Sequence, residues 1–170
     1  LFIGCSDSRV PAEHLTGARP GDLFVVRLPA NVVPPYGSPG YGVAAAIEFA
    51  VEDLRVRHVV VCGHTQCGGV GALAAGLNRE ARPALSGWMD HAQPLLDRPK
   101  PGADGDPLQA LVEANVVLQM EHLRTHPCVR RGVEEGRLDV HGWVFDLLHL
   151  EMRWWDPSVG AFEVYLPRES

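Results

Sequence analysis

The sequence predicts one α/β domain over residues 1–170, built on a mostly parallel sheet that ends in an antiparallel tail. Short continuous apolar runs bounded by glycine or charged residues are typical of strands covered on both faces, as in parallel sheets. A segment with helical apolar spacing separates two of these runs. The length of 170 residues is that of one ordinary domain.

The first half of the chain contains three predicted strands and one long helix. Residues 1–4, 23–26 and 59–62 are the continuous apolar runs. Residues 41–54 carry apolar side chains at 43, 47, 50, 51 and 54, which is a helical period. Strand, helix and strand in this order form a βαβ unit.

The middle of the chain is predicted to be helical. Residues 69–77 form a short helix of small residues, and Ser86 is the predicted N-cap of the next helix. Residues 98–106, with two prolines and two glycines, form a surface loop. Pro107 then opens a long helix through residue 123, because proline is favoured in a first turn.

The last part of the chain begins with one more helix, over residues 127–136. Strands follow: one over residues 138–144, then a pair that turns around residues 156–160, where aspartate, proline and glycine favour a turn. This pair forms the antiparallel tail of the sheet.

Composition excludes several classes of partner. The formal net charge of -6 argues against nucleic acid, whose phosphates require a basic face. No apolar run approaches the ~20 residues that a membrane span needs. The four cysteines are too few and too unevenly spaced for a disulfide scaffold, so we expect reduced thiols and a cytoplasmic location. The chain opens at Leu1 without Met, so a targeting segment stays an open alternative.

The chemistry is predicted where the first and third strands end. Ligands collect at the carboxyl ends of strands in open α/β sheets. The first strand leads into Cys5, and the third leads into His64 and Cys67. Two thiolates and an imidazole bind zinc and leave a fourth tetrahedral position for water, as in a catalytic site. A structural site would close with a fourth ligand, but Cys62, inside the strand, is predicted to pack in the core.

Charged and small residues flank these three ligands. Asp7 lies two residues past Cys5, where it can assist a zinc-bound hydroxide, and Arg9 can hold it ionised. A helix that starts after Cys67 would aim the N–H groups of Gly68 and Gly69 at an anion. Each feature has a structural alternative, because aspartate and glycine also close turns.

With these motifs in place, the chain resembles the β-class carbonic anhydrases. The runs CSDSR over residues 5–9 and GHTQCGG over residues 63–69 are similar to the two metal signatures of that family. Further similarity lies, in the expected order, over residues 27–31, 45–51 and 141–146.

The resemblance implies a zinc-dependent enzyme. It implies one Zn²⁺ per chain on Cys5, His64 and Cys67, the dyad Asp7–Arg9, and zinc-hydroxide catalysed reversible hydration of carbon dioxide to bicarbonate and a proton. It also implies strand order 2-1-3-4 with an antiparallel edge strand, helices on the sheet, and a homodimer or higher even oligomer. The family's helices before the first strand are expected to be missing from this chain.

The chain departs from one branch of the family. Members that close the site with their aspartate use a bicarbonate pocket of Trp, Arg and Tyr. Here Phe2 and Phe145 stand at the Trp and Tyr positions, and only Arg27 matches. Phenylalanine has no N–H or O–H for an anion. Residues 33–36 resemble the always-open members, so we expect an open site, with Tyr36 as a possible cleft residue.

Three alternatives remain open. A carbonyl sulfide or carbon disulfide hydrolase would use the same ligands and dyad. A non-catalytic, zinc-stabilised structural protein would need no dyad, yet Asp7 and Arg9 are present. A thiol redox protein would need a Cys-x-x-Cys pair, and Cys62 and Cys67 have the wrong spacing.

Overall fold

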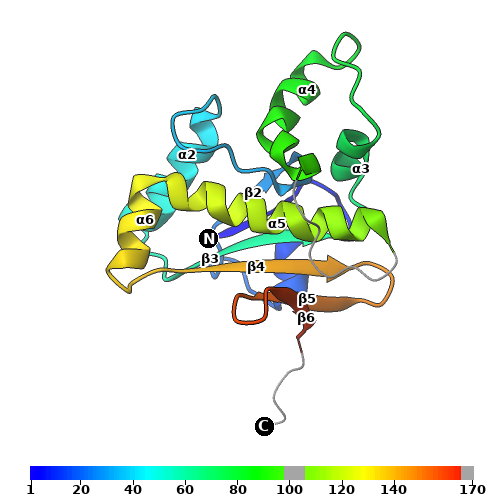
Figure 1. The fold of residues 1–170 in the computed structure, drawn as a ribbon. Coiled ribbons are helices and arrows are strands. Elements are labelled where there is room, and N and C mark those ends of the chain that lie inside the picture. The colour runs from blue at the N-terminus through cyan, green and yellow to red at the C-terminus, as the bar shows by residue number, and fades with distance from the viewer. Residues whose placement is uncertain (98–105, 166–170) are drawn as a thin grey trace.

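The protein, described here from a computed structural model over residues 1–97 and 106–165, contains a six-stranded sheet with the order β2-β1-β3-β4-β5-β6 (Figure 1). The strands β2, β1, β3 and β4 are parallel to one another. Strand β5 is antiparallel to β4, and β6 is antiparallel to β5. The α/β class, the order 2-1-3-4 and the antiparallel pair predicted around residues 156–160 are therefore confirmed, and this pair takes the place of the single edge strand that the resemblance implied. The strands are β1 (Phe2–Cys5), β2 (Val25–Leu28), β3 (His58–His64), β4 (Asp139–Asp146), β5 (Glu151–Asp156) and β6 (Ala161–Val164).

Helices connect and cover these strands. The longest, α5, packs on β3 and β4, and its second half contacts α6. The helices are α1 (Ala12–Thr16), α2 (Tyr41–Glu48), α3 (Gly68–Ala74), α4 (Pro83–Met89), α5 (Pro107–Thr125) and α6 (Pro127–Glu134). Three further helical segments are η1 (Pro29–Asn31), η2 (Phe49–Asp53), which continues α2 as the sequence predicted, and η3 (Asp90–Asp97).

Several predicted boundaries differ from the observed ones by one to three residues, and two of these errors have a clear physical reason. The second strand starts at Val25, two residues later than predicted, because Val25 pairs with Phe2 and the strand must match β1. Ser86 is not an N-cap: α4 begins at Pro83, and Ser86 is buried inside it. Proline at the first helical position, with its fixed φ, starts the helix instead.

The predicted loop over residues 98–106 lies outside the described residues except for Asp106. The side-chain Oδ1 of Asp106 accepts a hydrogen bond of 2.9 Å from the backbone N–H of Leu108. Asp106 is therefore the N-cap of α5, directly before Pro107, as the predicted start of this helix requires.

Two glycines let α5 lie close to the sheet. A Cβ at Gly142 of β4 would lie 2.5 Å from Met120 Sδ and 2.9 Å from Val116 Cγ1. A Cβ at Gly63 of β3 would lie 2.8 Å from Val116 Cγ2. Both distances are shorter than normal van der Waals contact, so the close approach of α5 depends on glycine.

The opposite face of the sheet carries a smaller apolar cluster. Phe2, Ala12 of α1 and Cys62 are buried there. The prediction that Cys62 packs in the core is confirmed, because only 2% of it is exposed. Half-buried side chains such as Val60 and Trp143 pack around this cluster.

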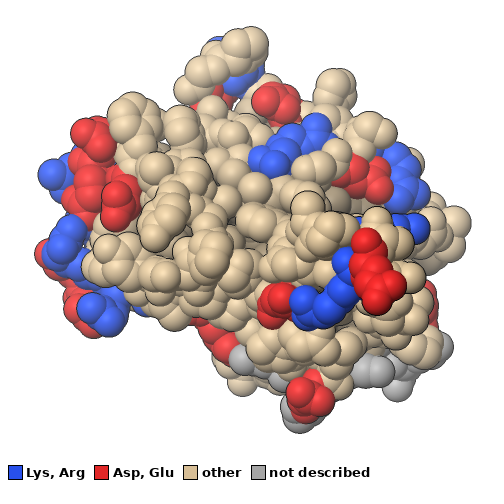
Figure 2. Space-filling view, turned by 90° about the horizontal axis from the view of Figure 1, so that it is seen from above, with Lys and Arg blue, Asp and Glu red and all other residues tan. Residues whose placement is uncertain are grey.

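Charges of both signs lie around the rim of the face seen in Figure 2, about a broad area without charged side chains. None of the described helices is both long and apolar enough to span a membrane.

Candidate metal centre

Cys5, His64 and Cys67 come together at the carboxyl ends of β1 and β3. The two strands are direct neighbours, with Gly4 paired to Cys62, so their last residues, Cys5 and His64, meet, and Cys67 follows His64 into the same place. One sulfur or nitrogen atom from each of the three side chains lies within 4.8 Å of the other two. All three side chains are buried. The sequence therefore predicted correctly that these side chains converge.

The imidazole of His64 presents an unpaired nitrogen to this group. Its Nδ1 lies 2.9 Å from the carbonyl oxygen of Thr65, so Nδ1 carries the proton and donates it. Nε2 then has a free lone pair, and this buried atom has no hydrogen-bond partner. A ring fixed by a carbonyl at one nitrogen and bare at the other is the usual arrangement of a metal-binding histidine.

The thiols of Cys5 and Cys67 shift each other's pKa in opposite directions. A hydrogen bond from Cys67 lowers the pKa of Cys5, and the same bond raises the pKa of Cys67. The backbone N–H groups of Val70 and Gly69 act in the opposite direction and lower the pKa of Cys67. Buried negative charge on sulfur requires a counter-charge, and a divalent cation beside both sulfurs supplies it. The donor set fits zinc.

Asp7 and Arg9 form a bidentate pair beside the group. Arg9 donates to Oδ1 of Asp7 from Nε at 2.9 Å and from its backbone N–H at 3.0 Å, and to Oδ2 from Nη2 at 2.7 Å. The Arg9 guanidinium holds the pKa of Asp7 well below its usual range. Oδ2 lies 3.8 Å from the bare Nε2 of His64. An ionised carboxylate thus stands next to the free ligand position.

The glycines after Cys67 begin α3, with Cys67 as the N-cap. A Cβ at Gly69 would lie 2.9 Å from the Cβ of Ala30, so the close packing of α3 on η1 requires glycine there. The N–H of Gly69 lowers the pKa of Cys67, whereas a Cβ added at Gly68 would meet no atom within 4 Å. Gly69 therefore supports the thiolate, which the sequence did not predict.

Tyr36 does not lie with the three ligands in this chain. Its backbone N–H donates to Oγ1 of Thr125 at 2.8 Å, at the end of α5. Val112, nearer the start of α5, lies beside Gly63 and therefore close to His64. The helix between Val112 and Thr125 spans ~20 Å.

Arg27 is a site residue whose contacts sequence reasoning missed. Its Nε donates to the carbonyl oxygen of Cys5 at 3.1 Å, and its Nη2 donates to the carbonyl oxygen of Asp7. One guanidinium from β2 thus holds the backbone on both sides of Ser6. An arginine on a strand predicted to neighbour the first ligand was the available signal.

Phe2 and Phe145 bring no polar group to the site. Phe2 is buried on the face of the sheet opposite α5, and its ring contacts that of Trp143 edge-on, with the ring centroids 6.5 Å apart. Phe145 pairs in register with His64 and is half-buried.

Comparison with known proteins agrees with this geometry. The sequence model of the family described as carbonic anhydrase matches residues 1–151. The chain is 47% identical over 150 residues to a carbonic anhydrase of Pseudomonas aeruginosa, and 44% identical over 150 residues to carbonic anhydrase 1 of Escherichia coli O157:H7. It covers 68% of the length of each of these relatives, with 86% of its own residues aligned. A relative from Synechococcus elongatus is covered over 56% of its length, at 39% identity.

Solved structures give the same result. The beta-carbonic anhydrase CcaA superposes with a TM-score of 0.89 at 32% identity, covering 96% of this chain and 82% of that one. A tetrameric beta-carbonic anhydrase of Sordaria macrospora superposes with a TM-score of 0.70 at 34% identity, covering 90% of this chain and 78% of its own.

Proposed function

This chain belongs to the β-class carbonic anhydrases, the lyases that interconvert carbon dioxide and bicarbonate, and we propose that it carries out this reaction with zinc held by Cys5, His64 and Cys67. The observation that carries the proposal is the buried Nε2 of His64, which has no hydrogen-bond partner, in a group with Cys5 and Cys67 whose ligand atoms lie within 4.8 Å of one another. Three such ligands leave one position open for chemistry.

Asp7 and Arg9 supply the proposed catalytic dyad. When bound, zinc lowers the pKa of a water molecule so that hydroxide is available near neutral pH. The Asp7 carboxylate, held ionised by Arg9, accepts a hydrogen bond from the attacking water and orients its oxygen lone pair toward carbon dioxide. The new bond joins that oxygen to the carbon, and the released proton passes to solvent. Arg27 keeps Asp7 in place by donating a hydrogen bond to the backbone carbonyl oxygen of Asp7.

Gly68 offers a backbone N–H for the bicarbonate product. The N–H of Gly69 favours the thiolate form of Cys67, so the part that we propose for it in anion binding is indirect, through the charge of that sulfur. We assign no substrate contact to Tyr36 within its own chain, since it lies at the far end of α5.

The proposed site keeps its fourth position open at acidic pH. Both carboxylate oxygens of Asp7 accept hydrogen bonds from the guanidinium of Arg9. A bicarbonate at the pocket that the closing members use would find no polar partner on Phe2 or Phe145. Hydration activity that recovers fully and without delay after exposure to acid supports this. A crystal structure at acidic pH with Asp7 bonded to zinc would refute it.

Two further expectations complete the proposal. A homodimer or higher even oligomer is supported by the tetrameric Sordaria macrospora structure. A cytoplasmic location is supported by the reduced, buried cysteines. The hydrolase, structural and redox alternatives have no comparable support, because the relatives named above are carbonic anhydrases.

The direct test combines zinc content with stopped-flow hydration of carbon dioxide. Asp7→Asn keeps the size of the side chain but removes its charge, and hydration should fall by about 10²-fold or more. Asp22→Asn, on an exposed loop, is the matched control and should hydrate like the native chain. Cys5→Ser should lose zinc. A native chain without zinc, or an Asp7→Asn variant with native hydration, would overturn the proposal.

A further inference from the structure

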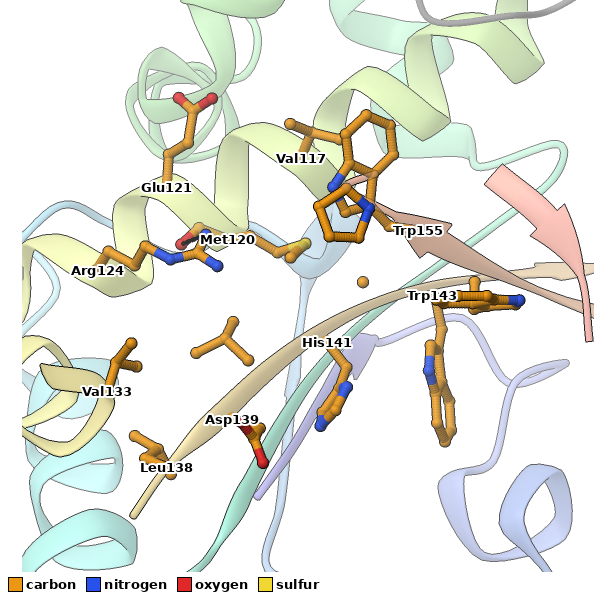
Figure 3. A pocket seen from close by; sticks show the side chains of 14 residues that line it. Val117, Met120, Glu121, Arg124, Val133, Leu138, Asp139, His141, Trp143 and Trp155 are labelled. Atoms are coloured by element: carbon orange, nitrogen blue, oxygen red, sulfur yellow. Dashed lines mark hydrogen bonds between the residues drawn. The ribbon is translucent and has the colours of Figure 1, made fainter. Parts of the chain in front are cut away.

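A second group of metal-ligating side chains lies at the amino-terminal ends of β3 and β4. His58 pairs in register with Asp139, and Val60 pairs with His141. Because side chains alternate along a strand, His58, Asp139 and His141 share one face of the sheet. In Figure 3, Asp139 and His141 extend from β4 on the side away from Met120 of α5. The proposed catalytic reaction uses none of these three side chains.

The distances among these side chains are those of a coordination shell. His58 Nδ1 lies 3.2 Å from His141 Nε2 and 3.7 Å from Asp139 Oδ2. One ligand atom from each residue lies within 4.8 Å of the other two. Ligands at about 2.0–2.1 Å from a tetrahedral ion are themselves ~3.3 Å apart. The two imidazoles and the carboxylate therefore need only small movements to bind one ion.

The chemistry of the group also favours a cation. Two imidazole nitrogens at 3.2 Å repel through their lone pairs unless a proton or a metal lies between them. Partial burial and the neighbouring His58 lower the pKa of His141, so its ring is ready as a neutral ligand. The adjacent carboxylate of Asp139 adds negative charge. The nearby Arg137 guanidinium is already compensated by Glu135 at 2.6 Å.

We propose that His58, Asp139 and His141 form a second metal site that binds one divalent transition-metal ion, with water completing its coordination. Two imidazoles and one carboxylate suit zinc and its neighbours in the first transition row, not calcium or magnesium. The side chains of His58 and Asp139 are 60% and 71% exposed, so the ion enters directly from solvent.

This site is separate from the catalytic one. His58 and His64 are the two ends of β3, and the strand between them spans ~20 Å. The ion at the second site joins β3 to β4 where their pairing begins. Its binding stabilises the fold and does not require the Cys5, His64 and Cys67 group to be filled.

Cobalt distinguishes the two sites by spectrum. In the tag-free full chain, the first equivalent of Co²⁺ on two thiolates gives an intense near-ultraviolet thiolate-to-metal band. The second equivalent should add visible d–d absorption without further growth of that band. Calorimetric titration with zinc of the chain whose first site already holds zinc should likewise show one additional site.

Variants then locate that second equivalent. His58→Ala and His141→Gln should weaken its binding at least about tenfold while hydration stays native. His14→Ala removes an exposed histidine of α1 and is the matched control, which should keep both equivalents. Native hydration in each variant shows that the chain is folded, so a loss of binding is not a loss of structure.

Two results would overturn the proposal. One is a native chain that binds no metal beyond the first equivalent. The other is a second equivalent that survives both His58→Ala and His141→Gln. Failure of the catalytic proposal would be distinct, because it would remove the thiolate band and leave the second equivalent intact.

Discussion

Gly63→Ala tests whether the packing of α5 positions His64. The added methyl group would lie 2.8 Å from Cγ2 of Val116, 3.3 Å from Cγ1 of Val112 and 3.6 Å from Oδ1 of Asn31. Both valines are buried and β-branched, so neither can rotate away easily. Either α5 or the end of β3 must therefore move, and His64 is the next residue on β3.

The size of the effect follows from the overlap. Carbon atoms in contact are normally about 3.5–4.0 Å apart, so the contact with Val116 is too close by roughly 1 Å. Overpacking of this kind costs up to about 3 kcal/mol, from which the lower chain entropy of alanine recovers up to about 1 kcal/mol. A net loss of about 2 kcal/mol lowers Tm by about 4–8 °C in a protein of this size.

Thermal unfolding, zinc content and stopped-flow hydration measure the consequences. We expect the fall in Tm together with a drop in hydration of up to about 10²-fold, because catalysis is sensitive to ~1 Å displacements. Gly87→Ala in α4, where the new Cβ meets nothing within 4 Å, is the matched control and should be neutral or stabilising.

A double-mutant cycle with Val116→Ala isolates the clash. Shortening Val116 opens the space that the new methyl group needs, so the two changes together should cost at least about 1 kcal/mol less than their sum. Native stability and hydration in Gly63→Ala, or strict additivity in the cycle, would show that the contact of α5 with β3 does not position His64.

Three further changes have defined outcomes. Glu113→Ala removes the carboxylate partner of the Arg153 guanidinium between α5 and β5. The change should cost about 3 kcal/mol in urea unfolding, clearly more than Glu113→Gln, and equal losses would mean that the charge of the pair contributes nothing. Burial lowers the pKa of His126, so the unfolded chain binds more protons, and stability should fall as pH drops below about 6.5, by at most about 1.4 kcal/mol per pH unit. The dependence of stability on pH should be weaker in His126→Gln and unchanged in the control His14→Gln. An unchanged pH dependence in His126→Gln would assign the titration to other groups. Burial raises the pKa of Cys62 to about 12, so iodoacetamide at about pH 8 should label it only in urea, by mass spectrometry; rapid labelling of the native chain would contradict the buried position.

Sequence pattern was a good guide to the elements. The apolar runs ending at Gly4 and Cys62 predicted parallel strands because both faces of such strands are covered. Pro107 marked the start of α5 because its missing N–H costs nothing in a first turn. Boundaries that depend on a partner were less accurate: β2 begins at Val25 because it pairs with β1, and no local pattern contains that register.

For the metal site too, some features were predictable from the sequence and others depend on the whole sheet. Residue type and spacing predicted that Cys5, His64 and Cys67 form one group with Asp7 and Arg9 beside it, because side-chain chemistry and proximity along the chain are local properties. The topology that makes β1 and β3 neighbours is a property of the whole sheet.

Contacts between distant elements were decided only in three dimensions. The hold of Arg27 on the Cys5 and Asp7 carbonyls, and the approach of His58 to His141, depend on which strands pair and on which face each side chain lies. The sequence by itself determined which donor atoms the chain carries and which strand ends carry the first group. The tertiary structure decided which of those atoms face a shared point, because a metal site requires directions and distances that spacing along the chain does not contain.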